Sequence, residues 1–588
     1  MCDLCVKKTM HSYVKGQMVI GIIMFTLFCL SANQGFSFNT ELFGEPLAIK
    51  GYVNQSAQFG IAGDQYDTKQ GFQQGILQAL LELEYTPTSD IKVFTSGLLY
   101  KDWAYNIYKG NSDWENRRFD EAQDEMSLHN DYEDMLKECH ISWAPEGFNV
   151  RVGKQIVSWG EMDGVRIMDQ INPKDVRIGP SDVEFETSII PIWLAKVVYY
   201  PDYKPDFLMD LGLEFTFNPN ADFLHDKIPG TGNYVNGIWG VNSFIPSLNG
   251  RVGAIQGDYD EPNTWSDGHE YAIRLMSTLQ DGTRLTLNFF KGVEDTPVIM
   301  PDSSRTGGSI DSIYQMVYSQ AYAATYEALI GYGYDPATAA AIAASTAASN
   351  AALYSHVPGL NGTTYYDDKG RQIIEPYMKG YYPDKKFAGF TCSKELESLY
   401  IGALGGVAPV LRCEALYEFD TTFTYNNLSN PYAPMYDFEQ HDAIFWGIAM
   451  DWKFKVNLIN ERRYISLVPQ FTHRYIRDYP SAPNTYLQNV SGSIVSENNY
   501  SFSVRMDTWY MNDKIQPFIY YQRDIRSDVS GITDGSVKAD LWLLALTYAP
   551  NSTWSYKVQA TFLDGAGWDK DRGMGNKDNI CFTVKYQF

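Results

Sequence analysis

The chain lacks the long apolar run that a membrane-spanning helix requires. After residue 31 no stretch is long and apolar enough to cross a bilayer as a helix, and the mean hydropathy is -0.30. The one apolar segment, residues 18–30, is short and follows three lysines, which is typical of a secretory signal peptide. We therefore expect residues 1–35 to be a signal peptide that directs export.

Cysteine and histidine are scarce, with 7 and 8 residues. Cys2 and Cys5 form a C-x-x-C pair, but it lies in the segment expected to be removed, and Met10 is an alternative start. The remaining cysteines and the histidines lack the spacing of metal ligands. We therefore expect no metal site and no cofactor, while a disulfide between Cys392 and Cys413 stays open because export permits it.

Net positive charge is also absent. The chain has 47 Lys and Arg against 71 Asp and Glu, a formal charge of -24. Such acidity argues against a nucleic-acid partner, because binding to phosphate backbones depends on lysine and arginine.

What the chain does have is a repeating pattern of alternating apolar and polar residues in segments long enough for a tilted membrane strand. Short turns, such as residues 86–90, 144–147 and 280–283, alternate with longer polar connections. The pattern predicts an all-β fold, a transmembrane antiparallel up-and-down β-barrel of about 18 strands (16–18) over residues 45–588. A soluble β-sandwich would explain the alternation but not the asymmetry of the connections.

The last strand has an aromatic face. Phe582, Val584, Tyr586 and Phe588 point to one side of this strand and polar residues to the other. This resembles the closing strand of bacterial outer-membrane β-barrels, whose terminal Phe is read by the barrel-insertion machinery. The resemblance implies a Gram-negative outer membrane, with lipid, lipopolysaccharide and that machinery as partners.

The same alternation places several charged side chains on the inner face. Inward acidic residues include Glu214, Glu414 and Asp451, and the inward arginines are Arg151, Arg274, Arg284, Arg412, Arg474 and Arg505. Either the mixed charges hydrate the lumen and hold inserted loops, or the arginines form a ladder that selects anions.

One segment carries a more specific resemblance. A strand ends in Gly-Lys-Gln at residues 153–155, Trp-Gly-Glu follows at 159–161, Asn-Pro-x-Asp at 172–175, and a later proline is Pro191. This pattern resembles the outer-membrane proteins grouped as domain of unknown function 1302. The resemblance implies a large porin-like barrel that passes small molecules, apolar or amphipathic compounds included.

Residues 156–191 form the first insertion, which we expect to fold into the lumen as a constriction. Its carboxylates would then face the inward arginines, whereas the alternative is that they only brace the loop on the wall. The residues expected at the constriction, besides the inward arginines, are Gln155, Trp159, Glu161, Asp163 and Asp175.

Residues 293–397 form a second insertion, far longer than an ordinary loop. Residues 310–330 and 337–353 are predicted to be helices, and Asp335 and Pro336 provide the N-cap and first turn of the second. Together the two helices are predicted to form an αα-hairpin. We expect this hairpin to be either an extracellular cap or a plug in the lumen.

The function predicted from these features is a porin-like channel or transporter for the diffusion of small molecules, and an oligomer is compatible with it. One alternative is an outer-membrane enzyme similar to a phospholipase, using His140 and Ser142 with Asn149 as the orienting group. The other alternative is a structural or adhesive barrel without transport. We expect no catalytic residues, because Ser142 is predicted to face the lumen near a short turn.

Overall fold

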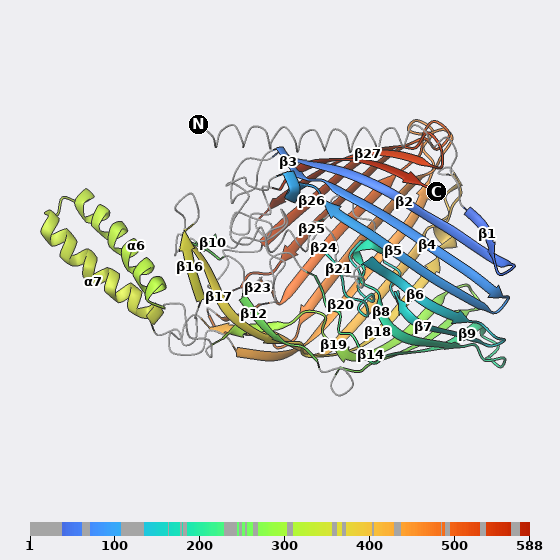
Figure 1. Cartoon of the computed structure of the whole chain (residues 1–588), viewed down its shortest axis with the longest axis horizontal. Coiled ribbons are helices and arrows are strands. Elements are labelled where there is room, and N and C mark those ends of the chain that lie inside the picture. Colours follow the sequence, from blue (N-terminus) through green and yellow to red (C-terminus); the bar gives the residue numbers. More distant parts are fainter. Residues whose placement is uncertain are drawn as a thin grey trace.

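The computed structural model describes most of the chain (Figure 1). The described residues are 38–61, 71–107, 135–162, 164–176, 179, 185–227, 244–245, 250–252, 256–262, 268–302, 310–355, 362–366, 372–402, 405–427, 437–483, 485–488, 494–529, 537–565 and 577–588. The predicted signal peptide, residues 1–35, lies outside them.

A 22-stranded antiparallel sheet dominates the fold. Four of its strands are short additions: β1 (Phe38–Leu42), β3 (Gly71–Gln74), β22 (Thr485–Gln488) and β23 (Ile494–Val495). The other 18 close into a barrel, which confirms the predicted fold class. They are β2 (Glu45–Gly60), β4 (Ile76–Thr88), β5 (Ile91–Asp102), β6 (Leu136–Trp143), β7 (Phe148–Gln155), β8 (Ile192–Tyr199), β9 (Leu208–Asn218), β13 (Glu270–Leu279), β14 (Arg284–Val293), β18 (Asp384–Glu395), β19 (Val410–Asn427), β20 (Asp437–Phe454), β21 (Ile465–Ile476), β24 (Asn498–Asp507), β25 (Ile515–Arg526), β26 (Val537–Tyr548), β27 (Trp554–Gly565) and β28 (Asn579–Gln587).

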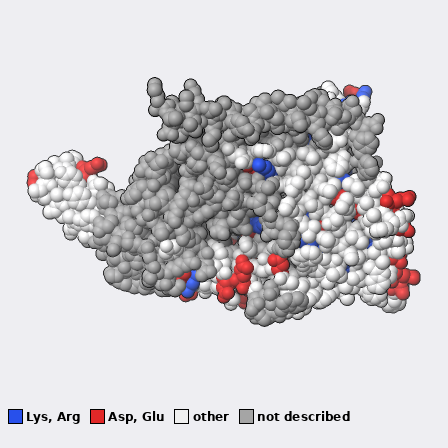
Figure 2. Space-filling view, in the orientation of Figure 1, with Lys and Arg blue, Asp and Glu red and all other residues white. Residues whose placement is uncertain are grey.

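The strands sort their side chains as the alternation predicts. On β13 Ala272 is buried, whereas its neighbours Tyr271 and Ile273 are exposed on the outer face. In the register of β9 and β13, Glu214 lies opposite Arg274 on the inner face. Figure 2 shows few charged side chains on the visible barrel wall, while acidic side chains gather at the end with the short turns. The outer face therefore suits hydrocarbon and the inner face suits water.

The chain end completes the barrel. β28 pairs with β2, and the Phe588 N–H donates to the Gly51 carbonyl oxygen at 2.9 Å, while the Gly51 N–H donates to the Phe588 carbonyl oxygen at 3.0 Å. A Cβ on Gly51 would lie 2.3 Å from the Leu80 carbonyl oxygen and 2.8 Å from the Phe588 ring. Only glycine leaves room for the terminal ring at this seam.

The helical hairpin lies outside the barrel, beyond the ends of its strands (Figure 1). It consists of α6 (Ile310–Gly331) and α7 (Pro336–Ser355), which pack through three fully buried alanines, Ala339, Ala343 and Ala347. The Asp335 carboxylate accepts the backbone N–H groups of Ala337 and Thr338, both at 3.1 Å. Hydrogen bonds from the Thr338 side chain and from these backbone groups lower the pKa of Asp335. This is an N-cap, as the Asp-Pro pair predicts.

A second sheet lies on the hairpin side of the barrel. Its strands are β10 (Phe244–Ile245), β11 (Gly250–Val252), β12 (Gln256–Asp260), β15 (Val298–Pro301), β16 (Gly362–Tyr366) and β17 (Gln372–Tyr381). Three short helices, α2 (Ala104–Ile107), α5 (Phe185–Ser188) and η2 (Glu397–Leu399), complete the elements. Within the described residues, neither long helix is apolar enough over its length to cross a membrane.

We predict that Gly51→Ala lowers the fraction of chain that closes into a barrel, because the new methyl group would overlap the Leu80 carbonyl. The fraction is measured by the difference in gel mobility between heated and unheated protein. The control is Gly97→Ala, a strand glycine whose added Cβ would meet nothing nearer than 3.6 Å. Equal folded fractions in the two variants would contradict the prediction.

Candidate functional site

Residues 156–191, here called the inner loop, connect β7 to β8 inside the barrel. Its apolar side chains form a buried cluster with inward-facing side chains of the wall. The loop contributes Val157, Trp159, Met162, Ile167, Met168 and Ile171, and the wall contributes Ala272, Phe290, Phe387, Leu416 and Ala449. Because these wall residues lie on the face opposite the lipid-exposed ones, the loop occupies the lumen.

The wall makes room for the loop with glycines. A Cβ on Gly389 would lie 2.5 Å from the Met168 sulfur, and one on Gly447 would lie 2.9 Å from Ile167 Cδ1. Larger residues at these two positions would therefore displace the loop toward the barrel axis.

Glu414 on β19 is the main polar anchor of the inner loop. Its carboxylate accepts the backbone N–H groups of Glu161, of Met162 at 2.9 Å and of Met168 at 3.0 Å. Two strands away on β21, the Gln470 side chain accepts the Gly164 N–H at 3.2 Å and donates to the Val165 carbonyl oxygen at 2.6 Å. Such bonds satisfy buried backbone groups that no secondary structure pairs.

Trp159 attaches the loop to a different part of the wall. Its indole Nε1–H donates to the Glu214 carboxylate on β9 at 2.8 Å, and the side chain is fully buried against Phe387. Arg274 on β13 donates to the Trp159 carbonyl oxygen at 3.4 Å. The indole is thus both an apolar contact and a directional anchor.

Two residues of the loop hold its own turns. The Asp169 carboxylate accepts the N–H groups of Trp159 and Gly160, both at 2.8 Å. The Asn172 side chain accepts the Val157 N–H at 2.7 Å and donates to the carbonyl oxygens of Gln155 and Ile190. The Asn-Pro motif therefore ties both ends of the inner loop together.

Most of the predicted inward arginines are already paired. Arg412 bonds the Glu161 carbonyl oxygen and Asp451, Arg474 lies 2.6 Å from Glu418, and Arg505 lies 4.0 Å from Asp507. Arg151 donates to Ser142 Oγ at 3.2 Å, whereas Arg284 is exposed at the short-turn end of β14. Three of the six arginines, Arg412, Arg474 and Arg505, form ion pairs with carboxylates, and two, Arg274 and Arg412, bond backbone carbonyl groups of the inner loop.

The predicted loop residues are held chiefly through their backbones. Glu161 contacts the wall through its N–H and carbonyl groups, and the Asp175 N–H donates to the Ser188 carbonyl oxygen at 2.7 Å. The Gln155 side chain is fully buried and donates to the Leu194 carbonyl oxygen at 3.1 Å. Asp163 lies outside the described residues.

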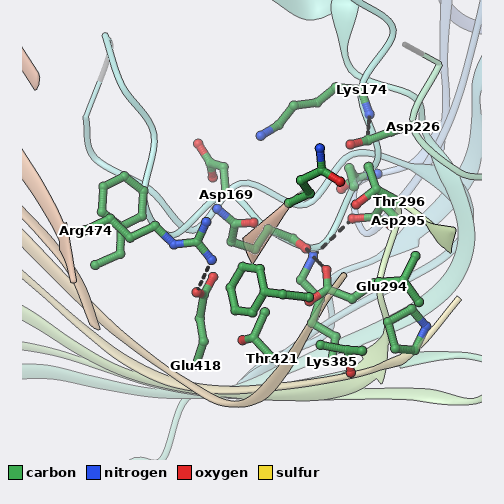
Figure 3. Close-up of a pocket in the computed structure, with 18 residues that line it drawn as sticks. Asp169, Lys174, Asp226, Glu294, Asp295, Thr296, Lys385, Glu418, Thr421 and Arg474 are labelled. Carbon is green, nitrogen blue, oxygen red and sulfur yellow. Dashed lines mark hydrogen bonds and ion pairs between the residues drawn. The ribbon is translucent and has the colours of Figure 1, made fainter. Parts of the chain in front are cut away.

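A cavity of about 240 Å³ opens beside the inner loop, here called the luminal cavity (Figure 3). Segments far apart in the chain line it: the inner loop, residues 226 and 294–298, and strands β18, β19, β20, β21 and β22. Its charged residues are Asp169, Lys174, Asp226, Glu294, Asp295, Lys385, Glu418 and Arg474. Lys174, Asp226, Glu294, Asp295 and Lys385 are site residues that the sequence reasoning missed, since only the fold brings their segments together.

Lys385 lies at the centre of one side of the luminal cavity. Its ammonium donates to the Gln170 carbonyl oxygen at 3.0 Å and lies 3.2 Å from Asp295 and 3.6 Å from Glu294. Figure 3 shows these two carboxylates converging on the lysine, with Arg474 against Glu418 on the other side. Burial raises the pKa of both Glu294 and Asp295, because it removes water from the charged carboxylates, and the nearby Lys385 ammonium offsets only part of this rise.

The His140 and Ser142 pair has loose geometry. Ser142 Oγ and His140 Nδ1 are 3.5 Å apart, and the Arg151 Nε–H points at the same hydroxyl oxygen. His140 stacks on Phe94, with ring centroids 5.3 Å apart. Among the described residues, no cluster of histidine, cysteine or carboxylate side chains could hold a metal ion.

Comparisons with known proteins place the chain by sequence. A model of the family described as "Protein of unknown function (DUF1302)" matches residues 35–588. A search among curated proteins finds no match.

Solved structures similar to the chain include three outer-membrane proteins at low identity. Salmonella typhi OmpF in complex with daunomycin is 10% identical, with 94% of this chain and 100% of that chain covered and a TM-score of 0.35. Acinetobacter baumannii OccAB3 is 9% identical (92% and 98% covered, TM-score 0.42), and Pseudomonas aeruginosa OpdK with vanillate is 7% identical (92% and 98%, TM-score 0.41). TM-scores this low carry no functional argument, so function has to be argued from the geometry of the chain.

We predict that Glu414→Leu lowers the free energy of unfolding by roughly 3 kcal/mol or more, because three buried N–H groups lose their acceptor at about 1–3 kcal/mol each. Urea titration of the detergent-solubilised barrel measures it. In the control Glu84→Leu, which breaks an exposed ion pair with Lys92, the loss is expected to stay below about 1 kcal/mol. Similar losses in both variants would show that Glu414 is no anchor.

The raised pKa of Asp295 also predicts a pH dependence. Above the ordinary value of 3.8 the folded chain holds a proton there that the unfolded chain has lost, so the free energy of unfolding falls as pH rises through the raised pKa. Over the pH range above 3.8 this decline should be smaller in Asp295→Asn than in the unmodified protein. Asp281→Asn is the control, since the pKa of exposed Asp281 is lowered and its titration lies below this range. An unchanged pH slope in Asp295→Asn would contradict the prediction.

Proposed function

The chain belongs to the family described as Protein of unknown function (DUF1302), and from the geometry of its barrel we propose that it is an outer-membrane channel for the diffusion of small molecules. The observation that carries the proposal is a loop fastened inside a closed barrel by hydrogen bonds to one continuous sector of the wall. A barrel of this strand number is wide enough for an aqueous lumen, and a loop held to one side narrows such a lumen without filling it.

The anchors of the inner loop support this asymmetry. Its described hydrogen bonds to the wall reach β6, β9, β13, β18, β19 and β21, which lie in one continuous sector. The second sector of the wall consists of β25, β26, β27, β28, β2, β4 and β5. We propose that solutes pass between the inner loop and this second sector, with Trp159 and Glu161 in the narrow part.

The second sector includes an apolar strip that favours amphipathic solutes. Leu541, Leu543 and Ala545 of β26 face the lumen, since their neighbours Trp542, Leu544 and Leu546 are exposed on the outer face. In the register of β25 and β26, Leu543 lies opposite Tyr520 and Ala545 opposite Phe518. These inward side chains are half-buried. Such a strip in a polar lumen gives the apolar part of a solute a surface to contact. This contact is favourable because it removes apolar surface of both the solute and the strip from water.

The outer-membrane location follows from the same barrel. Its outer face is apolar and aromatic along the strands, and its last strand exposes Phe582 on that face. We propose that a signal peptide in residues 1–35 exports the chain and that the terminal strand directs its insertion into the outer membrane. The phospholipase-like alternative has less support, because the Ser142 hydroxyl contacts an arginine and faces the lumen rather than lipid.

We predict stepwise ionic conductance when the purified full-length protein is reconstituted in planar lipid bilayers. Glu414→Leu, which frees the inner loop, is expected to change the conductance of single steps or add flicker, whereas Glu84→Leu leaves both unchanged. A correctly folded barrel without any conductance would overturn the channel proposal.

We also predict that the double variant Leu541→Ser with Leu543→Ser slows entry of an aromatic hydrocarbon into proteoliposomes by several-fold, because the apolar strip is lost. Entry of a neutral sugar should change little. Thr547→Ser on the same face of β26 is the control. Equal slowing of both solutes would assign the leucines a structural role instead.

A further inference from the structure

We propose that the luminal cavity binds a small zwitterion, an α-amino acid with an apolar side chain, whose carboxylate meets Lys174 and whose ammonium meets Asp226, Glu294 and Asp295. The proposal rests on the channel function above and names a class of solute for it.

The first observation is an ammonium group without an acceptor. The Lys174 backbone N–H donates to the Asp226 carboxylate at 2.7 Å, but its side chain forms no ion pair or hydrogen bond with any described residue. Figure 3 shows that side chain extending away from Asp226, toward the side of the cavity where Asp169 and Arg474 lie. Burial lowers the pKa of Lys174, and the negative charges of Asp226 and Asp295 offset only part of this effect.

The second observation is a surplus of carboxylates on the opposite side. Asp226, Glu294 and Asp295 gather where Lys385 is the one ammonium in contact with two of them. Lys385 is already saturated, because its third donor goes to the Gln170 carbonyl oxygen. A positively charged group entering this side would offset the remaining negative charge.

These two halves do not neutralise each other, because no pair of their charged atoms other than those of Lys385 comes within ion-pair distance among the described residues. The cavity separates them. A simple anion would leave the carboxylates without a new partner, and a simple cation would leave the Lys174 ammonium without one. A zwitterion matches both halves and adds none.

The volume of the luminal cavity and the side chains that line it restrict the class of solute further. A volume of about 240 Å³ is below the usual range for drug-sized ligands and suits a molecule the size of an amino acid. Val298, Pro383, Phe423 and Phe445 supply apolar surface beside the charged groups. That surface fits an aliphatic side chain better than a polar one.

Isothermal titration calorimetry on the detergent-solubilised full-length protein tests this with three matched probes: leucine, leucinamide as the cation and N-acetyl-leucine as the anion. We expect leucine to bind at least about tenfold more tightly than either analogue, the factor expected for one charge-assisted contact. Lys174→Met should remove the preference over leucinamide, and Asp295→Asn should remove the preference over N-acetyl-leucine. Lys174→Arg, which keeps the charge, should retain binding.

The controls are Lys394→Met and Asp281→Asn, which change the same residue types in an exposed ion pair at the short-turn end of the barrel. Both should bind leucine as the unmodified protein does. Tightest binding of leucinamide or of N-acetyl-leucine, equal binding of all three, or no binding would each overturn the proposal. Calorimetry needs no conductance, so a barrel that conducts without this preference refutes only the zwitterion site, and a barrel that binds leucine without conducting refutes only the channel.

Discussion

The carboxylate of Glu414 is the interaction on which the interior of this barrel depends. It lies on the inner wall and gathers three backbone N–H groups of one irregular segment, which would otherwise face water or remain unpaired. With that segment held, Trp159 can reach Glu214, and Ile167 and Met168 can fill the spaces beside Gly447 and Gly389. The luminal cavity exists because one of its walls is this fixed loop.

Much of the barrel was predictable because a strand has a period of two, so alternation assigns each side chain to lipid or lumen without knowledge of neighbours. That argument placed Glu414, Arg412 and Arg474 inside. On β26 nearly every residue from 541 to 549 is apolar, so alternation alone does not assign the two faces, and the exposed Trp542, Leu544 and Leu546 show that Leu541 and Leu543 face inward. Local chemistry also predicted the cap at Asp335, because an Asp-Pro start is a short-range signal.

The interior arrangement was harder to predict because its partners are far apart in sequence. The anchor joins residues near 161 to residue 414, and the luminal cavity joins segments near 174, 226, 295 and 385. Charge counting suggested loop carboxylates facing wall arginines. In the structure the main anchor has the opposite polarity, because backbone N–H groups of the loop donate to a carboxylate of the wall. Every residue except proline carries such an N–H group, so the sequence does not show which of them will bind the wall. The short Gly-Lys-Gln and Asn-Pro motifs identified the loop but not what it contacts.

The pairing of Gly51 with Phe588 has a consequence for how the barrel folds. The two residues stand at opposite ends of the described barrel, so their pairing is the most non-local contact in the wall. Forming it brings together residues that are far apart in sequence, so the entropy cost of closing this large loop opposes the first contacts between β2 and β28. Until then β2 and β28 are open edges able to pair with other strands. Pairing of Phe588 with Gly51 therefore removes both open edges at once.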